Sequence, residues 1–261
     1  MRVAGLFRFP VKGFTCEECE SLDVLAGGRI AGDRVLGLRF NPAAAHDDAW
    51  STKRDFVVLM NTPGLARLRL RFDHEALRLR IECDGTVLAD ETLDDAGRKR
   101  LAAAVERHVG ALDENPLASH EARLPLRVVG DGVTSRYQDQ EPGYVTLHGR
   151  GSVAALAATI AEPPQITETR FRSNIAIDGV DAWEEQRWIG RTLRVGDVEF
   201  SVVSPKTRCL ATHANPLTGE RDRPIMTTLL TLFPSERPTF AVAMRSDCGG
   251  TLRIGDNVEL T

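Results

Sequence analysis

Cys209 is the side chain in this sequence best suited to bind a metal or to attack an electrophile. It stands in the segment 206–210 (Lys-Thr-Arg-Cys-Leu), after an apolar strand pattern and before a loop rich in turn residues. Two cations within three positions favour the thiolate, the form of cysteine that does both kinds of chemistry. Functional residues also gather where strands end. A buried, unreactive cysteine is the alternative that these residues leave open.

A histidine near Cys209 suggests a second kind of chemistry. His213 follows it by four residues, and a Cys/His pair is the arrangement of a cysteine hydrolase. The sequence has no G-x-S-x-G, H-E-x-x-H, Walker or G-x-G-x-x-G motif, which counts against standard hydrolase, nucleotide and dinucleotide sites. It also lacks the cysteine run of a ferredoxin, so no iron–sulfur cluster is expected.

Three short segments place a cation beside a turn. Lys12 precedes Gly13, Arg34 follows a Gly-Asp pair, and Arg172 stands in the segment 170–174 (Arg-Phe-Arg-Ser-Asn). Cations together with backbone N–H groups suit an anionic ligand such as a phosphate, which arginine can hold through two hydrogen bonds. Taken singly, each cation is better explained as a solvated surface charge.

The five cysteines do not form a disulfide framework, because their number is odd and no export signal precedes them. Cys16 and Cys19 have the spacing of half a zinc site or of a redox pair. A closed zinc site needs four ligands, and no matching second pair occurs. The two glutamates between them also oppose a low thiol pKa, so incidental surface cysteines are the favoured interpretation.

Composition and charge exclude several classes of protein. The 261 residues include 33 Lys and Arg against 37 Asp and Glu, a net charge of −4, so the chain as a whole is not a nucleic-acid binder. No apolar run approaches the roughly 18 residues that span a membrane. The first residues also lack the continuous apolar stretch of a secretion signal. We expect a cytoplasmic protein without a membrane segment.

The hydrophobic pattern predicts a mainly β fold with a few helices. Alternating apolar and charged residues over 65–72 and 77–81 are typical of half-buried strands. Apolar residues at helical spacing from Asp95 to Val109 predict a helix capped by Asp94 or Asp95. Further strands are expected over 2–9, 22–25, 33–40, 87–89, 174–177, 192–195, 198–203, 240–245, 251–254 and 257–260.

The second half of the chain contains the other expected helices. One runs from Ser152, as its cap, to about Ala161, and Pro163-Pro164 ends it; a short one covers 224–232. A polar segment with two prolines separates the halves. We therefore predict two β-rich lobes, over 1–115 and 116–261.

Six motifs occur in the order found in MOSC-domain proteins, and the chain resembles that family over nearly its whole length. They are Phe9-Pro10-Val11-Lys12, Gly32-Asp33-Arg34, Phe171-Arg172-Ser173-Asn174, Arg208-Cys209, Asn215-Pro216-Leu217-Thr218-Gly219 and Ile254-Gly255-Asp256. The resemblance is to the type that pairs a MOSC N-terminal β-barrel domain with the MOSC domain, as in the mitochondrial amidoxime-reducing component and its bacterial relatives. It implies a β-barrel domain over 1–115 and a cofactor-binding MOSC β-barrel domain over 116–261.

The resemblance implies a molybdenum–molybdopterin cofactor with Cys209 as a direct ligand of the metal. A thiolate is a soft ligand that suits a redox metal. The basic residues of the family match Lys12, Arg34 and Arg172, which are expected to hold the pterin and its phosphate. Further expected cofactor contacts are Gly13, Thr207, Arg208, the segment containing His148, Gly149 and Ser152, and Asn174, which orients the loop after the arginine.

The implied reaction removes oxygen from the nitrogen of an N-hydroxylated compound, such as an amidoxime, a hydroxylamine or an N-hydroxylated base, and releases it as water. The chain ends at Thr261 without a ferredoxin domain. We therefore expect an external electron donor: a ferredoxin, a flavin reductase or a cytochrome b5-like protein. A cofactor or sulfur carrier without turnover of its own is the alternative.

Two positions depart from the family pattern. Relatives commonly have Thr-Thr shortly after the cysteine, whereas this chain has Thr212-His213, so we expect His213 to deliver protons near neutral pH. Asn215 stands where an acidic residue usually precedes the proline. Both changes point to a difference in substrate choice.

Overall fold

The computed structural model of this chain describes residues 1–41, 46–47, 49–118, 120–160, 166–234 and 237–261. The α-helices are α1 (Asp95–Gly110), α2 (Arg150–Thr159) and α3 (Ile225–Leu232). The strands are β1 (Arg2–Arg8), β2 (Glu17–Glu18), β3 (Ser21–Val24), β4 (Gly37–Arg39), β5 (Leu68–Asp73), β6 (Arg78–Cys83), β7 (Thr86–Thr92), β8 (Arg127–Val129), β9 (Val145–Gly149), β10 (Ile175–Asp178), β11 (Thr192–Val195), β12 (Val198–Thr207), β13 (Thr239–Arg245), β14 (Gly250–Arg253) and β15 (Val258–Leu260). Short 3-10 helices are η1 (Lys53–Asp55), η2 (Pro63–Arg67), η3 (Glu121–Arg123), η4 (Glu168–Phe171), η5 (Glu184–Trp188) and η6 (Leu210–His213).

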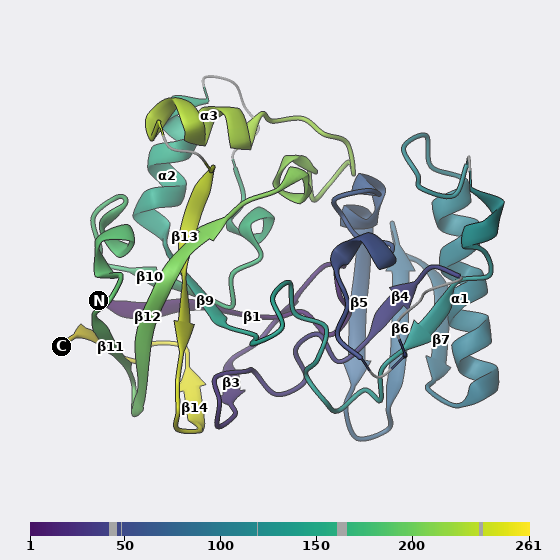
Figure 1. The fold of residues 1–261 in the computed structure, drawn as a ribbon, viewed down its shortest axis with the longest axis horizontal. Coiled ribbons are helices and arrows are strands. Elements are labelled where there is room, and N and C mark those ends of the chain that lie inside the picture. The colour runs from purple at the N-terminus through teal and green to yellow at the C-terminus, as the bar shows by residue number, and fades with distance from the viewer. Residues whose placement is uncertain (42–45, 48, 119, 161–165, 235–236) are drawn as a thin grey trace.

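The elements form two lobes that lie side by side along the long axis of the molecule (Figure 1). One lobe contains the sheet β5-β6-β7, the pair β4-β8 and helix α1, whereas the other contains an eight-stranded sheet with α2 and α3. Each lobe has its own hydrophobic core, the first around Leu70 and Leu101 and the second around Leu147 and Phe200. The prediction of a mainly β fold is confirmed. The division near residue 115 stays a prediction.

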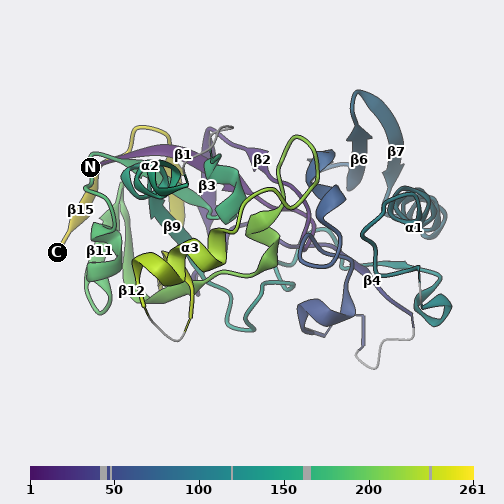
Figure 2. The same cartoon turned by 90° about the horizontal axis from the view of Figure 1, so that it is seen from above.

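The eight-stranded sheet joins the start of the chain to its second half. Its order is β15-β11-β12-β13-β9-β10-β1-β2, and β1 runs antiparallel to β10. Strands β9 and β10 are parallel, because α2 carries the chain back between them. Figure 2 shows β1 running from the N-terminus toward the other lobe. Beyond it, Val11 and Phe14 enter the core of that lobe, so the segment after β1 crosses between the two.

Two local patterns produce the elements that the sequence predicts. Along β5 the leucines and Phe72 are buried while Arg69 and Arg71 are exposed, as expected for a strand with one face on a core. Helix α1 begins after Asp94, whose carboxylate accepts the backbone N–H of Gly97 at 2.8 Å. This bond satisfies one of the free N–H groups at the start of the helix.

Two predicted strands are shorter than expected. The strand over 33–40 is reduced to β4, because Arg34 has a φ of 53° and cannot continue an extended chain. The strand expected from Leu65 begins only at Leu68, because Pro63–Arg67 forms the 3-10 helix η2.

The predicted start of α2 is wrong. The helix begins at Arg150, and Ser152 lies inside it with its hydroxyl donating to Glu185 at 2.8 Å. The predicted end at Ala161 and Pro163-Pro164 lies outside the described residues. Within the described part of the chain, no helix has both the length and the apolar composition needed to cross a membrane.

Replacing a side chain at the centre of the eight-stranded sheet tests the second core. Leu147 on β9 is fully buried, so Leu147→Ala is expected to lower the free energy of unfolding by about 2–5 kcal/mol through lost contacts and a cavity. Leu25→Ala is the control, because Leu25 is exposed and should change stability by less than about 1 kcal/mol. Urea denaturation measures both, and equal losses would contradict this account of the core.

Candidate functional site

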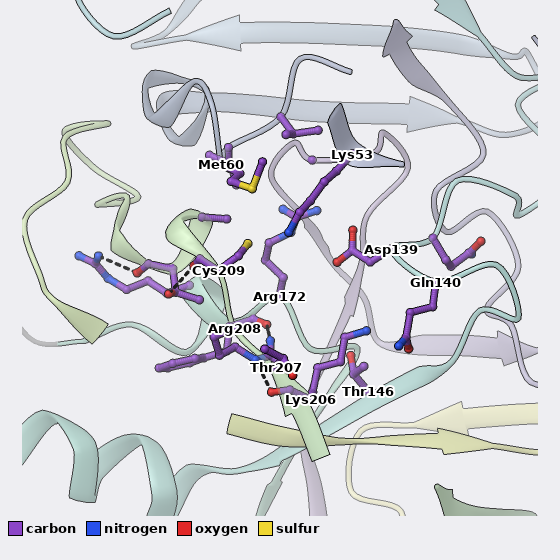
Figure 3. Close-up of a pocket in the computed structure, with 18 of the residues that line it drawn as sticks. Lys53, Met60, Asp139, Gln140, Thr146, Arg172, Lys206, Thr207, Arg208 and Cys209 are labelled. Carbon is purple, nitrogen blue, oxygen red and sulfur yellow. Dashed lines mark hydrogen bonds between the residues drawn. The ribbon is translucent and has the colours of Figure 1, made fainter. Parts of the chain in front are cut away.

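Six of the residues with predicted chemistry, Gly13, Arg34, Arg172, Thr207, Arg208 and Cys209, line a pocket between the lobes, beside the end of β12 (Figure 3). Both lobes contribute to its walls. The lining residues are Gly13, Arg34, Lys53, Val58, Leu59, Met60, Gln138, Asp139, Gln140, Tyr144, Thr146, Arg170, Phe171, Arg172, Lys206, Thr207, Arg208, Cys209, Ala211 and Thr212. Thr207, Arg208 and Cys209 therefore line the same pocket as Arg34 and Arg172.

Cys209 directly precedes the 3-10 helix η6, two residues beyond the end of β12. Its thiol is free and half-buried. In Figure 3 the sulfur points into the pocket, toward the space that Arg172 and Lys53 also enter. A partly accessible thiol among cations is the environment of a reactive or metal-binding cysteine, which argues against the buried, unreactive alternative.

Arg208 ties the loop of Cys209 to the loop of Arg172. Its Nη1 donates to the carbonyl of Phe171, the residue directly before Arg172, at 2.5 Å. Its Nε donates to the carbonyl of Lys206 at 3.1 Å. The guanidinium group therefore fixes the backbone on both sides of the pocket.

Arg170 makes the reciprocal contact. Its Nη1 donates to the carbonyls of His213 and Ala214, at 3.2 and 3.0 Å, just beyond Cys209. A salt bridge of 2.8 Å to Asp222 accompanies these bonds. A buried arginine needs such partners, because desolvating an unpaired charge is costly. The loops 168–172 and 208–214 are thus held to each other in both directions.

Arg34 and Arg172 share two unusual features. Both have a positive φ, 53° and 54°, and both guanidinium groups lie over the ring of Phe9, at 4.8 and 4.4 Å from its centroid. A positive φ costs a non-glycine residue conformational energy, and such residues cluster at ligand sites. The two like charges also repel each other, so an anion bound between them lowers the electrostatic energy.

A buried polar network fixes the position of Arg34. Asp33 forms an ion pair with Arg34 and accepts the backbone N–H of Phe9 at 2.8 Å. Asn174 Nδ2 lies 3.4 Å from the same carboxylate oxygen. Asn174 therefore links the loop after Arg172 to the loop of Arg34, which supports its predicted orienting role.

Lys12 and Gly13 shape the wall of the pocket from behind. The buried Lys12 Nζ donates to the carbonyls of residues 137 and 138, at 2.9 and 3.1 Å, directly before Asp139. Gly13 has a φ of 76°, and a Cβ at this position would lie 2.3 Å from the Val58 side chain, so only glycine fits. Lys12 itself does not line the pocket.

Cations dominate the electrostatics of the pocket. Burial lowers the pKa of Lys12 and of Lys206 to about 8, although Asp139 partly opposes both shifts. Burial also lowers the pKa of Arg172 to about 10. For Asp139 burial opposes ionisation, but the surrounding cations, Lys12 and Lys206 first, outweigh it and lower the pKa of the carboxyl. The excess of positive groups makes the electrostatic potential of the pocket favourable to an anion.

The residues present fit a phosphate-bearing cofactor with a metal at Cys209. Arg208 Nη2 is buried without a hydrogen-bond partner among the residues that the structure describes, and buried guanidinium groups are normally paired. An anion in the pocket would supply the missing acceptor. No three His, Cys, Asp or Glu side chains of the described chain cluster as metal ligands.

Three predicted cofactor contacts lie away from this pocket. His148 is buried on β9, with its Nε2 3.4 Å from Glu168. The N–H of Gly149 and the hydroxyl of Ser152 both donate to Glu185, at 3.3 and 2.8 Å. None of the three lines the pocket. Their role at the cofactor stays a prediction that no contact here supports, and the observed bonds instead fix the start of α2.

His213 also faces away from the pocket. Its Nε2 accepts the backbone N–H of Met226, near the start of α3, at 3.2 Å, and it does not line the pocket. Burial, Arg221 and Arg170 lower its pKa, so the ring is neutral at neutral pH and can keep this acceptor role. Its proton-delivery role stays a prediction without a supporting contact.

Cys16 and Cys19 pack in different places. Cys16 lies against Phe7 and Phe9, whereas Cys19 packs on the core of the second lobe. Both are free and half-buried. Burial raises the pKa of both thiols, that of Cys16 to about 11. This supports incidental cysteines over a zinc or redox pair, although neither is fully on the surface.

The sequence gives little sign of several lining residues. Lys53 and Asp139 lie far from Cys209 in the chain, in η1 and in a loop, and Met60 follows a short apolar run. The sequence shows Lys206 only as a cation near the cysteine. The usable signal for Lys53 is the polar run 51–55 (Ser-Thr-Lys-Arg-Asp), which directly precedes the apolar run 56–60.

Arg221 joins the two lobes beside the pocket. One nitrogen, Nη2, donates to the carbonyl of Met60 in the first lobe at 2.7 Å, and another, Nη1, donates to the carbonyl of Leu210, next to Cys209, at 2.8 Å. The Nε bridges both carboxylate oxygens of Glu114, at 2.9 and 3.0 Å. The guanidinium therefore fixes how far the first lobe stands from the cysteine.

Comparison with known proteins identifies similar sequences. Residues 137–259 match the family model described as MOSC domain. Molybdenum cofactor sulfurase from Caenorhabditis briggsae is 33% identical over 137 residues, which are 52% of this chain and 18% of that protein. Mitochondrial amidoxime-reducing component 1 from Homo sapiens is 32% identical over 134 residues, which are 48% of this chain and 38% of that protein. The chain spans less than two-fifths of the length of these curated relatives.

Among solved structures, the YuaD protein from Bacillus subtilis shares 10% sequence identity with the chain. The superposition has a TM-score of 0.43 and covers 99% of this chain and 94% of that one.

Anion binding to the pocket is expected to weaken as the pH rises from 7 to 9. Lys12 and Lys206 have pKa values of about 8, so they are charged below pH 8 and lose that charge above it. Inorganic sulfate is the probe, because its charge is constant in this range, and calorimetry measures its affinity. Lys206→Gln should weaken binding at pH 7 by about tenfold and reduce the pH dependence. Lys99→Gln, on the exposed side of α1, should change neither the affinity for sulfate at pH 7 nor its pH dependence. Identical pH profiles for the two variants would refute the assignment of Lys206 as a contact of the anion.

Removing the contact between the lobes should lower stability. Arg221→Gln leaves the carbonyls of Met60 and Leu210 without their donor, so the free energy of unfolding is expected to fall by about 1–3 kcal/mol. Arg245→Gln is the control, because its pair with Asp247 is fully on the surface and contributes little. Urea denaturation of both variants gives the comparison. A loss for Arg221→Gln no larger than for the control would show that the contact is not structural.

Proposed function

We propose, from the premise that residues 137–259 form a MOSC domain, that this chain is a molybdenum-cofactor-dependent reductase of N-hydroxylated compounds. Two relatives support the proposal by their names. The first, a molybdenum cofactor sulfurase, connects this kind of chain with the molybdenum cofactor, and the second is an amidoxime-reducing component. The choice of a reductase rests on the second name, which specifies the reduction of amidoximes.

The observation that carries the proposal is a free, half-buried thiol in a pocket of cations. Cys209 enters the same space as Arg172 and Lys53 (Figure 3). A thiolate is a soft ligand for a redox metal, and guanidinium groups hold phosphate through paired hydrogen bonds. We assign Cys209 as the molybdenum ligand, and Arg34, Arg172 and Arg208 as contacts of the pterin and its phosphate.

The cofactor, when bound, supplies the two-electron chemistry by which an N-hydroxylated compound loses its oxygen. In balance, R–NH–OH, two electrons and two protons give R–NH₂ and water. The residues of this chain position the group and neutralise its charge. The electrons come from an external donor such as a ferredoxin, a flavin reductase or a cytochrome b5-like protein.

Each residue of the pocket then has a part that its contacts support. The reciprocal bonds of Arg170 and Arg208 hold the thiol at a fixed place relative to Arg172. Asn174, through Asp33, keeps Arg34 in its left-handed conformation. Such pre-ordering lowers the cost of binding, because the ligating groups need not rearrange.

A carrier is the second candidate, and the match to a molybdenum cofactor sulfurase favours it. In this role the chain holds the cofactor, or a persulfide on Cys209, and passes it to another protein without turnover. The same pocket serves both functions, so measured turnover separates them.

Replacing Cys209 tests the proposed function. The protein purified from a host that makes the cofactor should contain near one molybdenum per chain and reduce benzamidoxime with an artificial electron donor. Cys209→Ser should lower this activity by more than the roughly 10- to 100-fold that loss of an outer-shell partner costs. Cys248→Ser, at an exposed free cysteine, should leave metal content and activity unchanged.

Pterin content distinguishes the remaining outcomes. Arg34→Gln and Arg172→Gln should retain less pterin, measured by fluorescence after oxidation. Unfolding curves of the same samples separate loss of the cofactor from loss of the fold, because Arg34→Gln also leaves the buried carboxylate of Asp33 without its ion pair. Full molybdenum content without turnover in the unmodified protein would favour the carrier. Undiminished activity of Cys209→Ser would exclude Cys209 as the ligand.

A further inference from the structure

A second groove between the lobes adjoins the pocket of Cys209. It has a volume of about 930 Å³ and shares Leu59, Arg170, Arg172 and Ala211 with that pocket. Its other walls come from α2, from residues 15–18 and from the turn after η6. Apart from the four shared residues, the walls of this groove take no part in the pocket of Cys209.

One part of the groove is apolar. Val153, Ala154 and Ala157 present one side of α2 to it, and Pro216 and Leu217 face it from the turn after η6. Leu217 is 69% exposed and therefore offers apolar surface to a ligand in the groove. A continuous apolar surface inside a groove marks a ligand site more often than plain surface.

The other part of the groove is polar and carries one net positive charge. Arg69 and Arg172 contribute two cations and Glu18 one anion. Cys16 adds no charge, because burial raises the pKa of its thiol to about 11. Arg69 is exposed on β5 and forms no ion pair with any residue that the structure describes.

The remaining charges of the groove are already neutralised. Arg150 Nη2 lies 2.8 Å from Glu168, and Arg170 lies 2.8 Å from Asp222. A ligand therefore meets two cations without a carboxylate partner among the described residues, Arg69 and Arg172, at the polar part. Glu18 is the one opposing charge there, and the surface along α2 has no net charge. This distribution selects a molecule with an apolar body and a single anionic group.

We propose that the groove binds a small amphipathic carboxylate, with its apolar body along α2 and its carboxylate at Arg69. The proposal goes beyond the reductase function and does not depend on it. Arginine suits a carboxylate because its planar fork matches the two oxygens. Each methylene buried along α2 adds to the affinity. The shared residue Arg172 places this ligand beside the pocket of Cys209.

Calorimetry with octanoate and the full chain tests the site. Octanoate should bind about tenfold more tightly than hexanoate, because two further methylenes are buried, and more tightly than octylamine, whose charge is opposite. Arg69→Gln should weaken octanoate binding by about tenfold. Arg71→Gln is the matched control, because Arg71 is exposed on the same side of β5 but does not line the groove.

A second pair of variants tests the apolar part. Ala154→Phe should block octanoate, whereas Ala158→Phe, also exposed on α2 but outside the groove, should not. Equal binding by Arg69→Gln and Arg71→Gln, or equal binding of octylamine and octanoate, would overturn the proposal. Cys209→Ser should bind octanoate like the unmodified protein. Failure of the reductase function and failure of this site are thereby separate results.

Discussion

The site depends on two buried arginines that hold each other's loops. Arg208 binds the carbonyl before Arg172, and Arg170 binds the carbonyls that follow the loop of Cys209. Loop carbonyls lie outside the strand ladders and need donors from elsewhere. A guanidinium group with five N–H donors can serve several of them at once. This exchange fixes the thiol and the cation at the pocket together, which neither loop achieves alone.

The same arrangement concentrates positive charge at a cost. Lys12, Lys206 and Arg172 have lowered pKa values because burial penalises their charged forms. Arg34 and Arg172 also have left-handed backbone conformations. Their guanidinium groups both lie over the ring of Phe9. Natural proteins keep such unfavourable features chiefly where function needs them. An anionic ligand relieves both the repulsion and the desolvation, so binding and stability are coupled at this pocket.

Polar bonds of Arg221 join the lobes close to the cysteine, and Ala214 packs there on the core of the first lobe. Arg221 reaches Met60, Leu210 and Glu114, and its bonds determine the spacing of the walls that both lobes provide. Arg172 lines both the pocket of Cys209 and the adjoining groove. A ligand in the pocket of Cys209 and a ligand in the adjoining groove would therefore both contact Arg172. Occupancy of the two sites is linked if Arg172 moves, because coupling requires a shared element.

The periodicity of the sequence determined those parts of the fold that depend on local contacts. The alternation in β5 and the capped helix α1 both form as predicted, because burial of one face and capping of the first turn are local effects. Periodicity alone missed the interruptions at residues 33–34 and 63–67, because Gly32-Asp33 and Pro63-Gly64 introduce a left-handed residue and a 3-10 turn that alternation does not show. The cap assigned to Ser152 failed because a distant carboxylate, Glu185, takes its hydroxyl.

By itself the sequence also determined the chemical types at the site: a thiol flanked by cations, and arginines beside turns at Arg34 and Arg172. Only the tertiary structure decided which of them meet. It brings Lys53 and Asp139 to the pocket from remote loops and leaves His148, Ser152 and His213 bonded elsewhere. The physical reason is that the fold of both lobes determines where a side chain lies and what it contacts. Its charge and its softness as a metal ligand are properties of the residue alone.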